Sequence, residues 1–205
     1  MGRGRSKVGG SNKFREVNDR QLLKLARDLK QEEWQLDSDE IRAADGYFGT
    51  SESFTLNRKL REGKRLSPHE KSVVSGLERS MKPMPYDFTS MRMVGDKFLH
   101  SLGVTDTSGH YTADTVKDLI GIQFSTPQFT STSAIRKSNV FGGRSCELEL
   151  RVKKGTSVLV SPHRAHFPTL SVDEGEVLLG RNAPMEVVGA QTINKNKIKL
   201  IVEVG

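Results

Sequence analysis

Residues 146–152 read Cys-Glu-Leu-Glu-Leu-Arg-Val, and residues 197–204 read Lys-Ile-Lys-Leu-Ile-Val-Glu-Val. In both stretches apolar residues alternate with charged ones, the pattern of a β-strand that buries one face and exposes the other. This period of two decides the fold class of the second half of the chain. Shorter strands are expected there at 88–94, 121–124, 129–133, 158–160, 176–179 and 185–188, with one short helix at about 113–119.

The first half of the chain has the period of helices. Leu22, Leu25, Ala26 and Leu29 form one apolar stripe, which predicts a helix from about residue 18 to residue 34. The stretch 67–70, Ser-Pro-His-Glu, has the form of a capping box and predicts the start of another helix, which ends before Pro83. Helices first and strands afterwards indicate an α+β fold. Two more helices are expected in between, at about 53–61 and, capped by Asp37 or Ser38, around Ile41, Ala44 and Phe48.

Composition indicates one domain with a basic tail. The chain has 205 residues, 35% of them hydrophobic and 28% charged, which is enough to bury a core. Residues 1–15 contain no acid and carry five of the seven net positive charges. We expect a disordered Gly/Arg tail over 1–16 and a folded domain over 17–205, with helices at about 17–82 and a sheet core at about 86–204. The tail is either a solvated terminus or a weak electrostatic contact for nucleic acid.

Several kinds of site and location are excluded at this level. No apolar stretch is long enough to cross a membrane, and no apolar run follows the basic N-terminus as in a secretory signal. Cys146 is the only cysteine, and His163 and His166 have no partner at ligand spacing, so no metal is expected. No glycine-rich phosphate loop follows a strand, so a nucleotide would have to be bound in another way.

Three segments of the strand half carry candidate chemical groups. Arg92 stands in the middle of the apolar strand 88–94, residues 129–133 read Phe-Thr-Ser-Thr-Ser, and Glu174 and Glu176 precede an apolar run. Taken singly, each has a structural explanation: a rim arginine with a packed stem, a polar strand face, and a polar turn. Their order along the chain favours a shared site.

Together these segments resemble the arginine–serine–glutamate class of ADP-ribosyltransferases, which includes bacterial toxins and phage-encoded transferases. Residues 56–61, 141–144 and 149–155 are similar to further family segments, so the resemblance covers about 37–204. It implies an ADP-ribosyltransferase-like fold, in which an N-terminal helical subdomain packs on two small, mostly antiparallel sheets around an NAD cleft. It also implies NAD as the substrate and no metal.

The resemblance assigns a role to each candidate residue in NAD cleavage. The bond to nicotinamide breaks through an oxocarbenium-like transition state, which a fixed carboxylate stabilises. Glu176 is that carboxylate, and Ser131 orients it. Arg92 is the first candidate to hold the diphosphate and Arg144 the second, because guanidinium groups bind phosphate with forked donors. Phe141 can cover the nicotinamide ring, or pack as an ordinary loop residue. Met93 and Thr132, next to Arg92 and Ser131, complete the cofactor-binding set.

Glu174 bears on the acceptor. A carboxylate two residues before Glu176 lies on the same side of an extended segment, where it can hold a guanidinium and take its proton. In the resembled family the Glu-x-Glu form accompanies arginine acceptors. We therefore expect transfer to a protein with an exposed arginine.

Two other functions stay open. One is ADP-ribosylation of nucleic acid, suggested by the basic tail, and the other is a catalytically silent binding or structural relative in a phage particle. The expected place of action is the cytoplasm of a bacterial host cell, after delivery by a phage or a secretion system.

Overall fold

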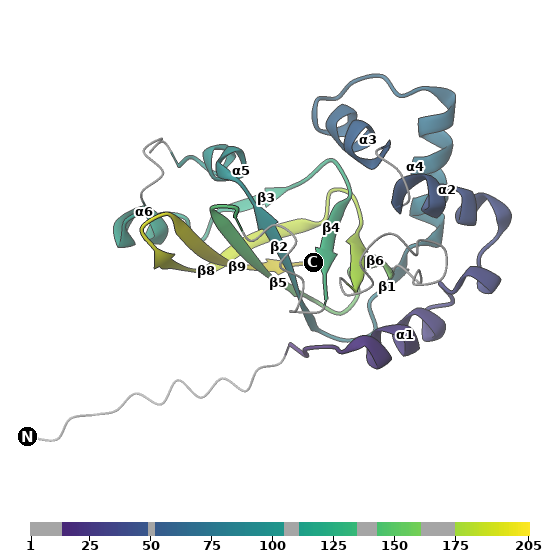
Figure 1. Ribbon diagram of the computed structural model, residues 1–205, viewed down its shortest axis with the longest axis horizontal. Helices are drawn as coiled ribbons and strands as arrows, with labels where there is room; N and C mark the ends of the chain where they lie inside the picture. The colour runs from purple at the N-terminus through teal and green to yellow at the C-terminus, as the bar shows by residue number, and fades with distance from the viewer. Residues whose placement is uncertain (1–13, 49–51, 105–110, 135–142, 161–174) are drawn as a thin grey trace, which may run out of the picture.

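The computed structural model describes residues 14–48, 52–104, 111–134, 143–160 and 175–205. Four helices come first along the chain, and a nine-stranded sheet follows them. In Figure 1, α1 to α4 gather at the end of the sheet that holds β1 and β6, and α5 and α6 lie at the other end. The helices are α1 Asp19–Asp28, η1 Glu33–Gln35 (a 3₁₀ turn), α2 Ser38–Phe48, α3 Glu52–Arg61, α4 Pro68–Ser80, α5 Asp96–Ser101 and α6 Ala113–Lys117.

The predicted start of α4 is confirmed in detail. The Ser67 side chain accepts from the Glu70 backbone N–H at 3.2 Å, and the Glu70 carboxylate accepts from the Ser67 N–H at 2.7 Å. The helix predicted for 18–34 is too long, because α1 ends at Asp28 and η1 follows a turn. Lys30 takes a left-handed conformation with φ of 57°, and the Gln31 N–H closes the turn on the Ala26 carbonyl. The short helix α5 was not predicted, because its Gly95 N-cap makes no side-chain capping bond.

The strands pair in the order β1-β6-β7-β4-β2-β5-β9-β8-β3, and among the strand pairs of the described residues only β5 and β9 run parallel. The mostly antiparallel prediction is therefore confirmed. The two expected sheets are hydrogen-bonded halves of one sheet, joined where Met91 of β2 faces Ser133 of β4. The strands are β1 Lys82–Pro83, β2 Phe88–Val94, β3 Gln123–Ser125, β4 Thr130–Ser133, β5 Cys146–Val152, β6 Ser157–Val160, β7 Glu176–Leu179, β8 Pro184–Asn194 and β9 Lys197–Val204.

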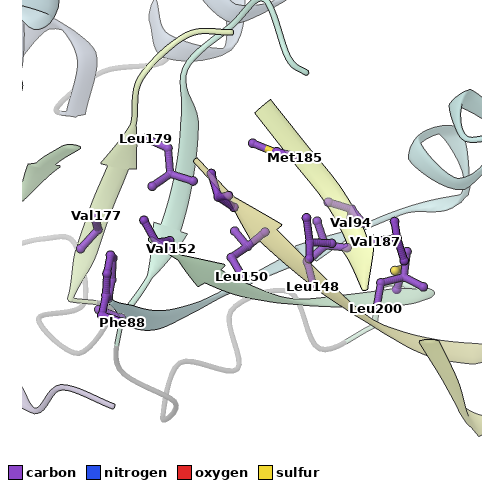
Figure 2. Packing of buried hydrophobic residues seen from close by; sticks show 14 of the residues in the cluster. Phe88, Val94, Leu148, Leu150, Val152, Val177, Leu179, Met185, Val187 and Leu200 are labelled. Atoms are coloured by element: carbon purple, nitrogen blue, oxygen red, sulfur yellow. The ribbon is translucent and has the colours of Figure 1, made fainter. Parts of the chain in front are cut away.

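The alternating residues of β5 and β9 bury their apolar face as predicted. Leu148 and Leu150 pack against residues of β2, β7 and β8 (Figure 2). Cys146 belongs to the same cluster, and burial raises the pKa of its thiol to about 12. A second cluster lies between α2–α4 and the strands β6 and β7, and it includes Phe129, the residue before β4. The helical subdomain is thus packed directly on the half of the sheet that contains β4 and β7.

The described chain begins before the predicted domain boundary at residue 17. The Arg15 N–H donates to the Asp87 carbonyl at 3.1 Å, and the Thr89 N–H donates to the Arg15 carbonyl at 2.8 Å. Arg15 thus pairs with the start of β2, and the remaining tail, residues 1–13, lies outside the described residues. Across the described ranges, no helix is long and apolar enough to cross a membrane.

Candidate active site

The candidate site lies where β2, β4 and β7 meet. Arg92 stands on β2, Ser131 on β4, and Glu176 is the first residue of β7. β4 and β7 are antiparallel, with Ser133 opposite Glu176 and Ser131 opposite Leu178. Ser131 and Glu176 are therefore diagonal neighbours on one face of the sheet, within reach of each other's side chains.

A hydrogen bond joins these two side chains. The Ser131 hydroxyl donates to Oε1 of Glu176, and both residues are half-buried. A carboxylate held by a donor on a neighbouring strand has a restricted orientation. It can present its other oxygen to a ligand hydroxyl or to a developing positive charge.

Arg92 crosses the gap between β2 and β4. The two strands share only the pair of Met91 and Ser133, and their ladder ends there. Nη1 of Arg92 donates to the Ser131 backbone carbonyl, which has no strand partner on that side among the residues of β2. The Arg92 side chain therefore makes a hydrogen bond between β2 and β4 where backbone pairing has ended. It connects the guanidinium to Ser131, the residue that donates to Glu176.

Positive charge is concentrated around this guanidinium. Burial is the largest influence on Arg92 and lowers its pKa, while the charges of Arg144 and Arg61 lower the pKa further. Glu176 and Tyr47 act in the opposite direction. Arginine stays protonated in proteins, so the site combines several guanidinium groups with one carboxylate. Such a group of cations suits a ligand that carries two phosphates.

Tyr47 of α2 and Asn57 of α3 complete the helical side of the site. The Tyr47 side chain is buried, its ring packs edge-on against Phe129 with centroids 5.7 Å apart, and its hydroxyl accepts from Nδ2 of Asn57 at 2.7 Å. Burial raises the pKa of Tyr47 to about 12, and the nearby charge of Glu176 raises it as well. Within the described part of the chain, Oδ1 of Asn57 is buried without a hydrogen-bond partner.

Comparison with known proteins identifies the family. The sequence model of the ADP-ribosyltransferase exoenzyme family matches residues 23–204. The chain belongs to this family. The resemblance carried by Arg92, residues 129–133 and Glu176 is thereby confirmed. No curated protein sequence matches the chain.

Solved structures show the same fold as this ADP-ribosyltransferase. The C3 exoenzyme of Clostridium limosum matches with a TM-score of 0.72 at 18% identity, over 94% of this chain and 97% of that one. C3stau2 of S. aureus, solved with NAD, matches with a TM-score of 0.69 at 20% identity, over 94% and 99%. The enzymatic component C2-I of the Clostridium botulinum C2 toxin matches with 0.72 at 16% identity, over 92% of this chain and 48% of that one.

Two of the predicted cofactor contacts of the ADP-ribosyltransferase need comment. Thr132 is buried, and its hydroxyl donates to the Val177 carbonyl at 2.7 Å, so its side chain does not join Ser131 and Glu176. Alternation along β4 sends neighbouring side chains to opposite faces, and a contact between Thr132 and the cofactor stays a prediction. Met93 is half-buried, and it is the residue that would face Ser131 if the β2–β4 ladder continued.

The other predicted residues differ in what the structure describes. Arg144 is exposed and acts electrostatically on Arg92. Glu174 and Phe141 lie outside the described residues. Asn57 and Arg61 belong to the segment 56–61, which carried part of the resemblance, but no role was predicted for either residue. The motif predicted the segment, and the structure shows its contacts: Asn57 bonds to Tyr47, and the charge of Arg61 acts on Arg92.

A separate pocket of about 250 Å³ lies among α2, α3 and the start of α4. Tyr47, Glu52 and His69 are among its lining residues, while Ser131 and Glu176 are not. Among the described residues, no group of three or more His, Cys, Asp or Glu could hold a metal ion. The described site thus consists of a carboxylate, a hydroxyl and guanidinium groups.

Proposed function

We propose that this ADP-ribosyltransferase cleaves NAD at the bond between nicotinamide and ribose and transfers the ADP-ribose to an arginine of a protein. The observation that carries the proposal is the Ser131–Glu176 hydrogen bond beside Arg92. It joins an oriented carboxylate to a cationic group, as cleavage of a dinucleotide requires.

Glu176 stabilises the transition state in this proposal. When the ribose C1′–N bond breaks, its electron pair moves to the nicotinamide nitrogen, and neutral nicotinamide leaves. The ribose is then an oxocarbenium-like cation, which the carboxylate of Glu176 attracts while it accepts a hydrogen bond from the ribose 2′-hydroxyl. The Ser131 donor holds the carboxylate in that position before the reaction begins.

The arginines bind the diphosphate. Arg92 is the first ligand, because its guanidinium is fixed between β2 and β4. Arg61 and Arg144 supply further positive charge, as their influence on the Arg92 pKa indicates. Met93 on β2 and Phe141 are proposed to contact the nicotinamide end.

Glu174 prepares the acceptor. It precedes Glu176 by two residues, so an extended chain directs both carboxylates to one side. The acceptor guanidinium binds to Glu174, gives up a proton to it, and attacks the ribose C1′ with the freed electron pair. The products are ADP-ribosylated arginine and nicotinamide.

The test measures nicotinamide release and protein labelling from labelled NAD in the presence of bacterial lysate. Glu176→Gln should lower both signals by a factor of about 100 or more, because it removes charge stabilisation of the transition state. Glu174→Gln should keep nicotinamide release and lose labelling. Glu186→Gln is the matched control, since Glu186 is exposed on β8, which is not one of the three site strands. Full activity in Glu176→Gln would contradict the proposed role.

The basic tail supports a second candidate acceptor, nucleic acid. Residues 1–15 carry five positive charges and no acid, and such a segment binds polyanions with strong salt dependence. If nucleic acid is the acceptor, removal of residues 1–13 should lower RNA or DNA labelling steeply at low salt. An unchanged rate of nucleic-acid labelling excludes a role for the tail. If wild-type protein releases no nicotinamide at all, the chain is a silent relative.

The place of action is proposed from the same resemblance. A bacterial host cytoplasm, reached through a phage or a secretion system, fits an NAD-consuming enzyme. Identification of the labelled acceptor in that lysate tests it directly.

A further inference from the structure

One polar side chain is completely buried at a distance from the catalytic residues. Gln31 follows α1 and has 0% exposure. A buried amide requires partners for its two N–H groups and its oxygen. The catalytic roles proposed above make no use of it.

Gln31 bonds to three backbone groups of two other elements. Its Nε2 donates to the Val158 carbonyl at 2.7 Å and to the Ser80 carbonyl at 2.9 Å. Its Oε1 accepts from the Val160 N–H at 3.0 Å. Ser80 is the last residue of α4, where carbonyls lack helical partners.

The two bonds to β6 reproduce strand pairing. A residue of a neighbouring parallel strand pairs with the carbonyl of one residue and the N–H of the residue two further on, and the Gln31 amide does the same. β1 faces β6 only at Ser157 and Val158. Gln31 thus extends the edge of the sheet beyond β1 to Val160.

The segment of β6 that bonds to Gln31 is paired with β7, the strand that begins with Glu176. On its other side β6 pairs with β7, with Val160 opposite Val177 and Val158 opposite Leu179. Val177 follows Glu176 in the chain. β7 is therefore held by β4, which carries Ser131, on one side and by the segment of β6 that Gln31 anchors on the other.

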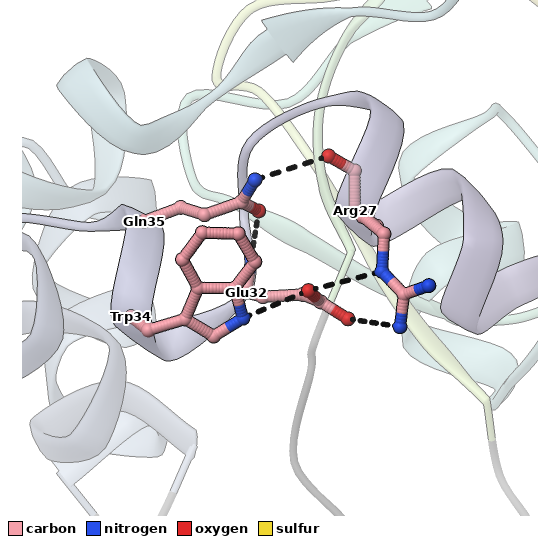
Figure 3. Close-up of polar contacts among 4 residues, drawn as sticks. All are labelled: Arg27, Glu32, Trp34 and Gln35. Carbon is pink, nitrogen blue, oxygen red and sulfur yellow. Dashed lines mark hydrogen bonds and ion pairs between the residues drawn. The ribbon is translucent and has the colours of Figure 1, made fainter.

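Polar contacts around Gln31 fix the turn that carries it. The Glu32 carboxylate accepts from Nε of Arg27 at 3.3 Å and from Nε1 of Trp34 at 2.9 Å (Figure 3). Nε2 of Gln35 donates to the Arg27 carbonyl at 3.4 Å. Lys30, with φ of 57°, turns the chain at the end of α1. These contacts stabilise a turn in which the Gln31 side chain points into the protein interior.

We propose that Gln31 is a positioning residue for Glu176, acting through β6 and β7. The proposal rests on the proposed function, in which Glu176 is catalytic. Because Arg92 lies on β2, beyond β4, loss of Gln31 should change the placement of the carboxylate more than the binding of NAD.

The first test is Gln31→Met, which keeps the length of the side chain and removes its hydrogen bonds. We expect kcat for nicotinamide release to fall by about 10- to 100-fold, the cost of a small misplacement of a catalytic group, with KM for NAD changed less than about twofold. Tyr111→Phe is the control: it removes the hydroxyl that donates to Asp96 at 2.6 Å from a buried residue in the other half of the molecule. It should leave kcat unchanged. Equal effects of both variants on kcat would show a merely structural role.

Gln31→Glu provides a conservative rescue with a pH signature. A neutral carboxyl can donate one bond and accept from Val160, whereas an ionised one faces two carbonyl oxygens. Its kcat should therefore approach that of the wild type at low pH and fall as pH rises, while circular dichroism shows folded protein. A pH profile parallel to that of the wild type contradicts the proposal.

A readout without turnover separates this inference from the proposed function. The carbon-13 shift of the Glu176 carboxyl, assigned through Glu176→Gln, should move in Gln31→Met and stay unchanged in Tyr111→Phe. If wild-type protein releases no nicotinamide but the shift moves as expected, positioning stands and the proposed function fails. If the shift does not move in folded Gln31→Met, the positioning role is overturned.

Discussion

At the residue scale, Ser131 makes two contacts in the candidate site. Its hydroxyl donates to Glu176, and its backbone carbonyl accepts from Arg92. One residue thus links the proposed catalytic carboxylate to the proposed phosphate ligand. A substitution of the Ser131 side chain that leaves β4 intact keeps the backbone carbonyl that binds Arg92. The role of the hydroxyl can therefore be tested separately.

We predict that Ser131→Ala lowers kcat for nicotinamide release by about 10- to 100-fold and changes KM for NAD little. The carboxylate loses its donor, while the carbonyl that binds Arg92 remains. Steady-state kinetics check this prediction. Ser101→Ala is the control, because the Ser101 hydroxyl is exposed and bonds within α5. Equal kcat values for both variants would show that Glu176 needs no orientation by Ser131.

At the element scale, local turns place the helices. α1 ends because Lys30 occupies the position after a helix where glycine is usual. Left-handed backbone costs about 1 kcal/mol for a residue with a long side chain. The left-handed backbone of Lys30 is part of the turn that places the Gln31 side chain in the interior.

Lys30→Gly should therefore raise the free energy of unfolding by about 0.5–1 kcal/mol without loss of activity. Urea denaturation measures the change. Asn182, with φ of 58°, offers a matched control. Because asparagine tolerates this conformation, Asn182→Gly should change stability by less than about 0.5 kcal/mol. Equal gains at both positions would show that the Lys30 side chain is not the source of the strain.

An ion pair between α3 and α4 makes the stability of the fold depend on pH in the acid range. Nζ of Lys59 lies 2.6 Å from the Glu70 carboxylate, and this hydrogen bond, followed by the one from the Ser67 N–H, lowers the pKa of Glu70 to about 2. A carboxylate with a depressed pKa stabilises the fold above its unfolded-state pKa of about 4.3. That stability is lost as pH falls toward 2. Glu70→Gln should make unfolding less dependent on pH in this window, and Glu62→Gln, at an exposed position, should alter it less.

At the scale of the whole molecule, a buried thiol and a buried phenol limit the stability of the fold at alkaline pH. Burial raises the pKa values of Cys146 and Tyr47 to about 12. In the unfolded chain these groups ionise near 8.5 and 10. Between those values and about 12 only the unfolded state loses the protons, so it is favoured as pH rises.

We predict a fall in the free energy of unfolding that begins near pH 9 and steepens above pH 10. Each group contributes a slope of about 1.4 kcal/mol per pH unit in its own window. Urea titrations at several pH values measure the slope. Cys146→Ala should remove most of the decline between pH 9 and 10. Tyr47→Phe should remove about half of the additional slope above pH 10, because burial also raises the pKa of Tyr111 to about 12. A flat dependence in the wild type would show that neither group stays protonated in the fold.

Much of the fold and the order of the site residues followed from local patterns. Alternation identified residues 146–152 and 197–204 as strands, and the capping box at 67–70 identified the start of α4. The missed elements, such as α5 and the turn at Lys30, lack a strong local signal. The hydroxyl of Thr132 bonds to the Val177 carbonyl of β7, a contact that depends on strand pairing and that the sequence pattern does not show.

The sequence by itself thus determined the α+β class, the family and the set of arginine, serine and glutamate residues, since these depend on period and motif. The tertiary structure alone decided that Arg92 bridges to Ser131, that Tyr47 and Asn57 stand beside them, and that Gln31 braces β6. Such contacts join residues far apart in the chain. They depend on strand order and register, which local periodicity does not specify.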